Sequence, residues 1–151
     1  MLRNILIISF LFCLSVSCSD GITSTIPNAP VSLTLDLIGR DNSLNGTLSY
    51  KEFTTPRDAT DRLGYGGLLV VNGLGENLVN LFVYDLACPN EAQSNIRVKP
   101  DETGLTATCP KCGAVYRIAE GGAPQSGSKY WLRRYNVVAT PGSDTRYKVT
   151  N

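Results

Sequence analysis

Short apolar runs bounded by turn-forming residues are the feature that most constrains how this chain of 151 residues can fold. The clearest run is VSLTLDL at residues 31–37, where apolar and polar side chains alternate with the period of two expected of a half-buried strand. Similar runs follow at residues 67–71, 78–86, 105–108, 114–118, 130–138 and 147–149. After residue 20, no segment sustains the i, i+3, i+4 spacing of an amphipathic helix. The pattern predicts an all-β fold with at least seven short strands.

The composition supports this prediction and limits the partners. The chain has 14 Gly, 8 Pro and 7 Tyr, which favour turns and short strands. It has 14 basic and 13 acidic side chains, so it lacks the basic excess that binding to nucleic-acid phosphates requires. Its length allows one domain with its own apolar core. We therefore predict a single β domain over residues 31–151 that does not bind nucleic acid.

The first 17 residues have the pattern of a signal peptide. Arg3 supplies one positive charge, and residues 5–14 are apolar except for Ser9, a run too short for a permanent membrane-spanning helix. The following segment, LSVSC at residues 14–18, resembles the lipobox of bacterial lipoproteins. This resemblance implies that Cys18 is acylated and becomes the new N-terminus. In the alternative, cleavage after Ser17 leaves Cys18 as a free thiol.

The lipobox resemblance also sets the expected location and partner. Residues 18–30 are polar and rich in turn formers, as a tether between an anchor and a domain would be. We expect a lipoprotein of the bacterial cell envelope, held to a membrane through Cys18 on the periplasmic or outer-membrane face. The sequence indicates no particular protein partner.

Residues 41–52, DNSLNGTLSYKE, match the ligand spacing of an EF-hand calcium loop. Their surroundings argue against calcium, because an EF-hand loop lies between two helices. Here a predicted strand precedes the loop, and Pro56 prevents a helix from following it. The Asn45-Gly46 dipeptide favours a tight turn, so we predict a strand–turn–strand hairpin.

Three cysteines and a carboxylate have the spacing of metal ligands. Cys88 and Glu91 form one pair, and Cys109 and Cys112 form a second pair with the same separation. Two such pairs are typical of a four-cysteine zinc ribbon, here with one cysteine replaced by glutamate. The spacing therefore predicts zinc ligands at all four positions. Two alternatives remain: a disulfide, either Cys109–Cys112 or one involving Cys88, and loops that bind nothing, with Glu91 a solvated surface charge.

A longer pattern around these cysteines resembles the Rieske family. The segments VYDLACPN, TCPKCGAVYRIAEGG and LRRYNV carry the resemblance, which extends from about Gly64 to Val138. It implies a fold of stacked antiparallel sheets in which two loops meet at one tip. In the family, two cysteines and two histidines in these loops hold a [2Fe-2S] cluster.

Only part of the family's ligand set is present. The residues that match the family's loops are Cys88, Cys109, Gly113 and Tyr116. Asn90 and Cys112 occupy the two histidine positions, and Ala114 replaces a serine that electron-transfer members use. The chain contains no histidine, and asparagine is a weak neutral ligand for iron. The leader also has a single arginine, whereas export of a folded cluster protein generally uses a twin-arginine signal.

These observations predict an exported, lipid-anchored, Rieske-like domain whose remodelled tip holds a structural zinc ion or a disulfide. The alternative is an electron-transfer protein that binds [2Fe-2S] through the three cysteines and one oxygen or amide donor. We predict no enzyme activity, because no histidine is available as a general base and no nucleophile motif occurs. Thiol–disulfide exchange by the CPKC segment at residues 109–112 is a further candidate, although such motifs normally begin a helix.

Overall fold

The computed structural model describes residues 24–77 and 79–151. The predicted signal peptide, Cys18 and the first part of the predicted tether lie outside the described residues. Within the described ranges, no helix is long and apolar enough to cross a membrane.

The fold is all-β, as the alternating pattern predicts. The helical turns in the described ranges are η1 (Asn42–Asn45) and η2 (Ile118–Glu120), both 3-10. The strands are β1 (Val31–Asp36), β2 (Tyr50–Phe53), β3 (Arg62–Leu63), β4 (Leu68–Asn72), β5 (Leu81–Asp85), β6 (Lys99–Pro100), β7 (Thr106–Thr108), β8 (Val115–Arg117), β9 (Ala123–Ser126), β10 (Arg134–Ala139) and β11 (Arg146–Thr150). Each of the seven predicted runs overlaps one of these strands. No predicted run covers β2, β3, β6 or β9, which are short or mostly polar.

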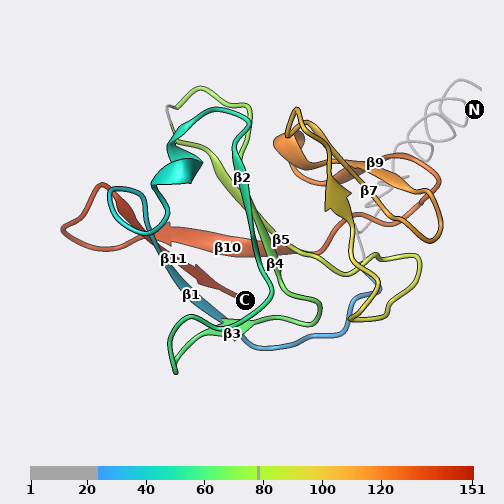
Figure 1. Ribbon diagram of the computed structural model, residues 1–151, viewed down its shortest axis with the longest axis horizontal. Coiled ribbons are helices and arrows are strands. Elements are labelled where there is room, and N and C mark those ends of the chain that lie inside the picture. The colour runs from blue at the N-terminus through green and yellow to red at the C-terminus, as the bar shows by residue number, and fades with distance from the viewer. Residues whose placement is uncertain (1–23, 78) are drawn as a thin grey trace, which may run out of the picture.

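The strands form two stacked antiparallel sheets. A seven-stranded sheet has the order β2-β4-β5-β10-β11-β1-β3, and a four-stranded sheet has the order β6-β7-β8-β9. Figure 1 shows the small sheet and its loops at one end of the long axis, with the turn between β10 and β11 at the opposite end. The small sheet carries the second cysteine loop, between β7 and β8, and the first cysteine loop follows β5 of the large sheet.

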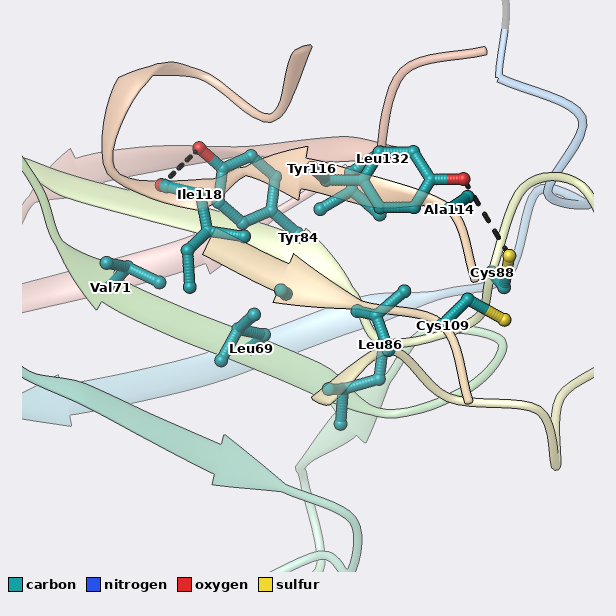
Figure 2. Close-up of a cluster of buried hydrophobic side chains, with 12 residues drawn as sticks. Leu69, Val71, Tyr84, Leu86, Cys88, Cys109, Ala114, Tyr116, Ile118 and Leu132 are labelled. Atoms are coloured by element: carbon teal, nitrogen blue, oxygen red, sulfur yellow. Dashed lines mark hydrogen bonds between the residues drawn. The ribbon is translucent and has the colours of Figure 1, made fainter. Parts of the chain in front are cut away.

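Strand β4 separates two apolar cores, which explains why its sequence LLVVN is buried throughout. Leu69 and Val71 face a core between the two sheets, which also contains Cys88 and Cys109 (Figure 2). The intervening residues, Leu68 and Val70, face a second core beneath β1. Because successive strand residues point to opposite faces, a strand between two cores reads as a continuous apolar run.

The predicted hairpin at residues 41–52 is wrong. Strand β1 pairs with β11 and β3, whereas β2 pairs with β4. Gly46 has a φ of −81°, so it does not adopt the left-handed conformation of a type I′ turn. Long-range packing outweighs the local turn preference, because Leu44 is fully buried in the core beneath β1.

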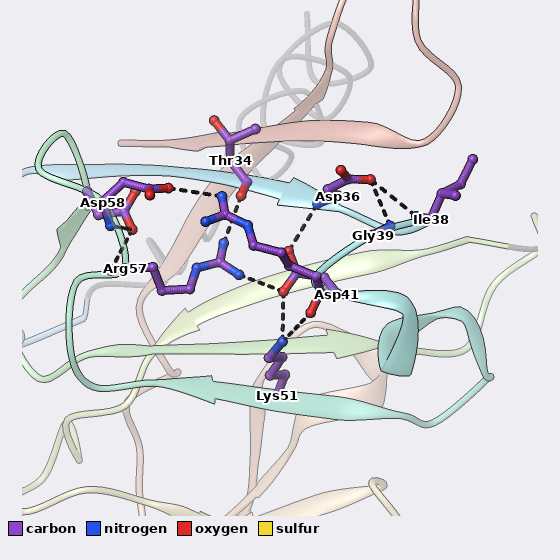
Figure 3. A network of polar contacts seen from close by, with 10 residues as sticks. Thr34, Asp36, Ile38, Gly39, Asp41, Lys51, Arg57 and Asp58 are labelled. Atoms are coloured by element: carbon purple, nitrogen blue, oxygen red, sulfur yellow. Dashed lines mark hydrogen bonds and ion pairs between the residues drawn. The ribbon is translucent and has the colours of Figure 1, made fainter.

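The carboxylate of Asp41 fixes the start of this loop (Figure 3). Asp41 is fully buried, and its Oδ1 lies 2.8 Å from both Lys51 Nζ and Arg57 Nη1. Its Oδ2 accepts a hydrogen bond from the backbone N–H of Asp36 at 3.0 Å. The side chain that would be the first calcium ligand of an EF-hand is therefore already neutralised by two cations.

The described part of the predicted tether, residues 24–30, lies against the domain. Ile26 is buried, and its carbonyl accepts a hydrogen bond from Arg133 at 3.0 Å. Closer to β1, the carbonyl of Pro30 accepts a hydrogen bond from Gly64 N–H at 3.0 Å. This segment is therefore packed onto the fold, unlike the free linker that its composition suggests. We call residues 24–30 the N-terminal arm.

Candidate metal centre

The first cysteine loop begins where β5 ends and makes a tight turn. The backbone N–H groups of Glu91 and Ala92 donate hydrogen bonds to the Cys88 carbonyl at 3.1 and 2.9 Å. Ala92 has a φ of 49°, a left-handed conformation that few non-glycine residues adopt. Glu91, three residues after Cys88, therefore lies within this turn.

The second cysteine loop, between β7 and β8, makes a similar turn. The Gly113 N–H donates to the Cys109 carbonyl at 3.0 Å, and Gly113 has a φ of 72°. In both loops, therefore, the fourth residue after the first cysteine is left-handed and bonds back to that cysteine. Glu91 in the first loop corresponds to Cys112 in the second.

The fold brings the three cysteines together, although Cys88 is far from the other two in the sequence. Their three sulfur atoms lie within 4.8 Å of one another, and Cys88 Sγ lies 3.7 Å from Cys112 Sγ. All three residues are free thiols; Cys88 and Cys109 are buried, and Cys112 is exposed. Figure 2 shows Cys88 and Cys109 at one end of the core between the sheets, with the Tyr116 hydroxyl directed at Cys88. The cluster is thus open to solvent on the Cys112 side only.

The surroundings shift the pKa values of two of these thiols in opposite directions. Burial raises the pKa of Cys88 to about 12, and a hydrogen bond with Cys109 acts in the same direction. At Cys112, burial also acts to raise the pKa, but hydrogen bonds from the Ala114 N–H and the Asn90 amide, among others, outweigh it and lower the pKa. Donors that point at a sulfur stabilise its thiolate, which is the form that binds metals.

Glu91 lies beside this group of sulfurs but is not part of it. Its Oε2 forms an ion pair with Lys111 Nζ at 2.6 Å, which joins the two cysteine loops. The hydrogen bond to Glu91 raises the pKa of Lys111. The structure therefore brings together Cys88, Cys109 and Cys112, and places the predicted fourth ligand in a salt bridge next to them.

Asn90 has a structural role that the sequence does not reveal. Its Nδ2 donates to the Gly127 carbonyl at 2.7 Å, and its Oδ1 accepts from the Ser128 hydroxyl at 2.8 Å. Its Nδ2 also lies 3.5 Å from Cys112 Sγ. Asn90 thus connects both cysteine loops to a third loop at residues 127–130. We call these three loops the cysteine tip.

Asp85 is a second residue that sequence reasoning missed. This fully buried carboxylate accepts hydrogen bonds from the N–H groups of Tyr65, Gly66 and Ala87 and from the Tyr135 hydroxyl, all at 2.8 to 2.9 Å. It lies three residues before Cys88 and holds the start of the first cysteine loop against the glycine-rich segment at residues 64–67. The available signal was an acidic residue within an otherwise apolar strand.

Comparisons with known proteins add no identification. No model of a known protein family matches the chain, and no curated protein sequence matches it either. The resemblance to Rieske proteins therefore stays a prediction that rests on the residues quoted above.

Proposed function

We propose that the cysteine tip binds a structural zinc ion through Cys88, Cys109 and Cys112. The sulfur spacing is the observation that carries the proposal. Tetrahedral zinc with Zn–S bonds of about 2.3 Å separates two sulfur ligands by about 3.8 Å. The Cys88 and Cys112 sulfurs are 3.7 Å apart, and all three sulfurs lie within 4.8 Å. Thiolates are soft ligands, so a set of three thiolates binds zinc in preference to hard cations such as calcium and magnesium.

Glu91 is the fourth ligand in this proposal. It occupies the position in the first turn that Cys112 occupies in the second, so a short side-chain movement brings its carboxylate to the sulfurs. That movement requires release of Lys111, whose side chain is 54% exposed and can be solvated elsewhere. A bound ion would tie β5 to the small sheet, and its binding free energy would stabilise the native state.

In the wider proposal, this zinc tip belongs to an exported, lipid-anchored, Rieske-like domain without catalytic activity. The stacked antiparallel sheets and the two loops that meet at one end support the relationship. The alternative [2Fe-2S] centre needs a donor in addition to the three cysteines. The amide of Asn90, at a histidine position, is already engaged by Gly127 and Ser128, which disfavours that alternative.

Metal analysis of protein purified from its native membrane tests the centre. We expect one zinc per chain, no visible absorption, and three thiols that react rapidly only after chelation. Iron with acid-labile sulfide would favour the cluster instead. A single reactive thiol, with or without chelator, would show a disulfide and contradict the zinc proposal.

Two matched variants test the fourth ligand. Glu91→Gln and Lys111→Gln break the same salt bridge, but only Glu91→Gln removes a carboxylate ligand. We expect Glu91→Gln to weaken zinc affinity and Lys111→Gln to preserve it, as measured by competition with a chromophoric chelator. Equal affinities would exclude Glu91 from the coordination sphere.

The anchor is tested separately with Cys18→Ala. If Cys18 carries the lipid, this variant leaves the membrane fraction and appears as soluble protein. Its retention in the membrane fraction would contradict the proposed anchor.

A further inference from the structure

The N-terminal arm is held along the domain at several points. Arg133 donates to the Ile26 carbonyl at 3.0 Å and to Asn28 Oδ1 at 2.8 Å. Asn151 donates to Asn28 Oδ1 and to the Ala29 carbonyl, both at 2.9 Å. These bonds come from the loop before β10 and from the residue after β11, so residues that flank two strands of the large sheet fix the path of the arm.

The N-terminal end of the arm lies at the cysteine tip. The Thr25 hydroxyl donates a hydrogen bond to the Pro89 carbonyl, one residue after Cys88. In Figure 1 the tip loops lie at one end of the long axis, and the turn between β10 and β11 lies at the other. Any segment that precedes residue 24 therefore leaves the domain at its cysteine end.

The length of chain between Cys18 and Thr25 limits how the domain can face a membrane. These seven residues reach at most about 25 Å when fully extended. A globular domain of this size has a radius of gyration of about 14 Å, which corresponds to a diameter of about 36 Å. A domain standing with its β10–β11 turn on the bilayer would hold Thr25 farther away than the chain can reach.

We propose that the cysteine tip faces the bilayer that carries the protein and contacts its anionic lipid headgroups. This inference rests on the proposed lipidation of Cys18. The surface of the tip suits such a partner, because the exposed side chain of Lys129 offers one cation, and Lys111 offers a second when zinc binding releases it from Glu91. The ammonium group of Lys129 also lies 5.1 Å from the ring centre of Tyr130, next to Trp131. Aromatic and lysine side chains are typical of surfaces at the lipid–water boundary.

Energy transfer from tryptophan to lipid tests this orientation. Trp131 is the single tryptophan of the chain and follows the third loop of the tip. The native lipidated protein is reconstituted into vesicles of phosphatidylcholine and phosphatidylglycerol containing dansyl-phosphatidylethanolamine. The comparison protein combines Trp131→Phe with Val138→Trp, because Val138 is 59% exposed near the far end of β10. We expect transfer from Trp131 to be several-fold stronger than transfer from the tryptophan introduced at position 138.

A variant with a long Gly/Ser linker inserted after Asp20 provides the control for the length argument. We expect the linker to reduce the contrast between the two tryptophan positions, because it permits other orientations. Equal or reversed transfer in vesicle-bound protein with the natural linker would overturn the orientation alone. Failure of the protein to float with the vesicles would overturn the lipid anchor, and this inference with it.

Discussion

Replacing Asp85 by asparagine should destabilise the domain strongly, although the two side chains have the same shape. Asp85 Oδ1 accepts from the N–H groups of Gly66 and Ala87, and Oδ2 accepts from the Tyr65 N–H and the Tyr135 hydroxyl. If the asparagine oxygen keeps the Oδ1 partners, its NH₂ group must face the Tyr65 N–H. The Tyr135 hydroxyl can rotate to accept, but the Tyr65 N–H cannot.

The magnitude follows from these contacts. Losing one hydrogen bond to a charged acceptor costs about 1.5 to 3 kcal/mol, and leaving a buried donor unsatisfied costs about 1 to 3 kcal/mol. We therefore expect Asp85→Asn to reduce the free energy of unfolding by about 3 to 5 kcal/mol, a large fraction of a typical total of about 5 to 15 kcal/mol. Tyr135→Phe is the matched control, because it removes one of the four hydrogen bonds and leaves no donor unsatisfied.

Urea denaturation of both variants provides the measurement. We expect the midpoint to fall much further for Asp85→Asn than for Tyr135→Phe, with the denaturant slope unchanged in both. A loss below about 1 kcal/mol for Asp85→Asn would refute the conclusion that this carboxylate organises the first cysteine loop.

Three further predictions concern the loop at residues 41–52 and two glycines. Hydrogen bonds from Lys51, the Asp36 N–H and Arg57 lower the pKa of Asp41, although burial acts to raise it. The stability that this lowered pKa contributes is complete above the unfolded-state pKa of about 3.9 and is lost as the pH falls through the folded-state pKa. Asp41→Asn should therefore reduce the free energy of unfolding by about 3 kcal/mol at pH 7 and by less at pH 3, as measured by urea midpoints. Calcium titration should leave the melting temperature unchanged, and a clear rise would contradict our account of this loop. Gly104→Ala should destabilise the domain by at least about 2 kcal/mol more than Gly113→Ala in thermal unfolding. Both glycines are left-handed, but only at Gly104 would an added Cβ overlap the Leu48 carbonyl oxygen. Equal losses would show that backbone strain alone decides both.

The local pattern of apolar and polar residues predicted the main strands well, but it did not predict which strands pair with each other. The alternation at residues 31–37 is visible because one face of β1 is buried. No apolar run marks strand β2, because only Phe53 of its four residues is buried. The Asn45-Gly46 signal is a real local preference, but burial of Leu44 outweighs it.

The candidate centre could be predicted only in part, for a similar reason. Residue type and spacing singled out Cys88, Cys109 and Cys112, and the structure places their sulfurs together. Spacing cannot tell whether a carboxylate binds a metal or a neighbouring lysine, because both attract it. Glu91 therefore needed the structure, which shows its contact with Lys111. The bridge that Asn90 makes depends on a loop that carries no motif.

The pairing of β1 with β11 affects when the domain can fold. The first and last strands lie side by side, with Ser32 opposite Thr150 and Asp36 opposite Arg146. The large sheet cannot close until both strands are available, so the loop-closure entropy of nearly the whole domain must be overcome first. A chain that crosses a membrane unfolded, N-terminus first, would thus complete its fold only on the far side. Late closure of the large sheet would keep such a chain competent for translocation until β11 has been released.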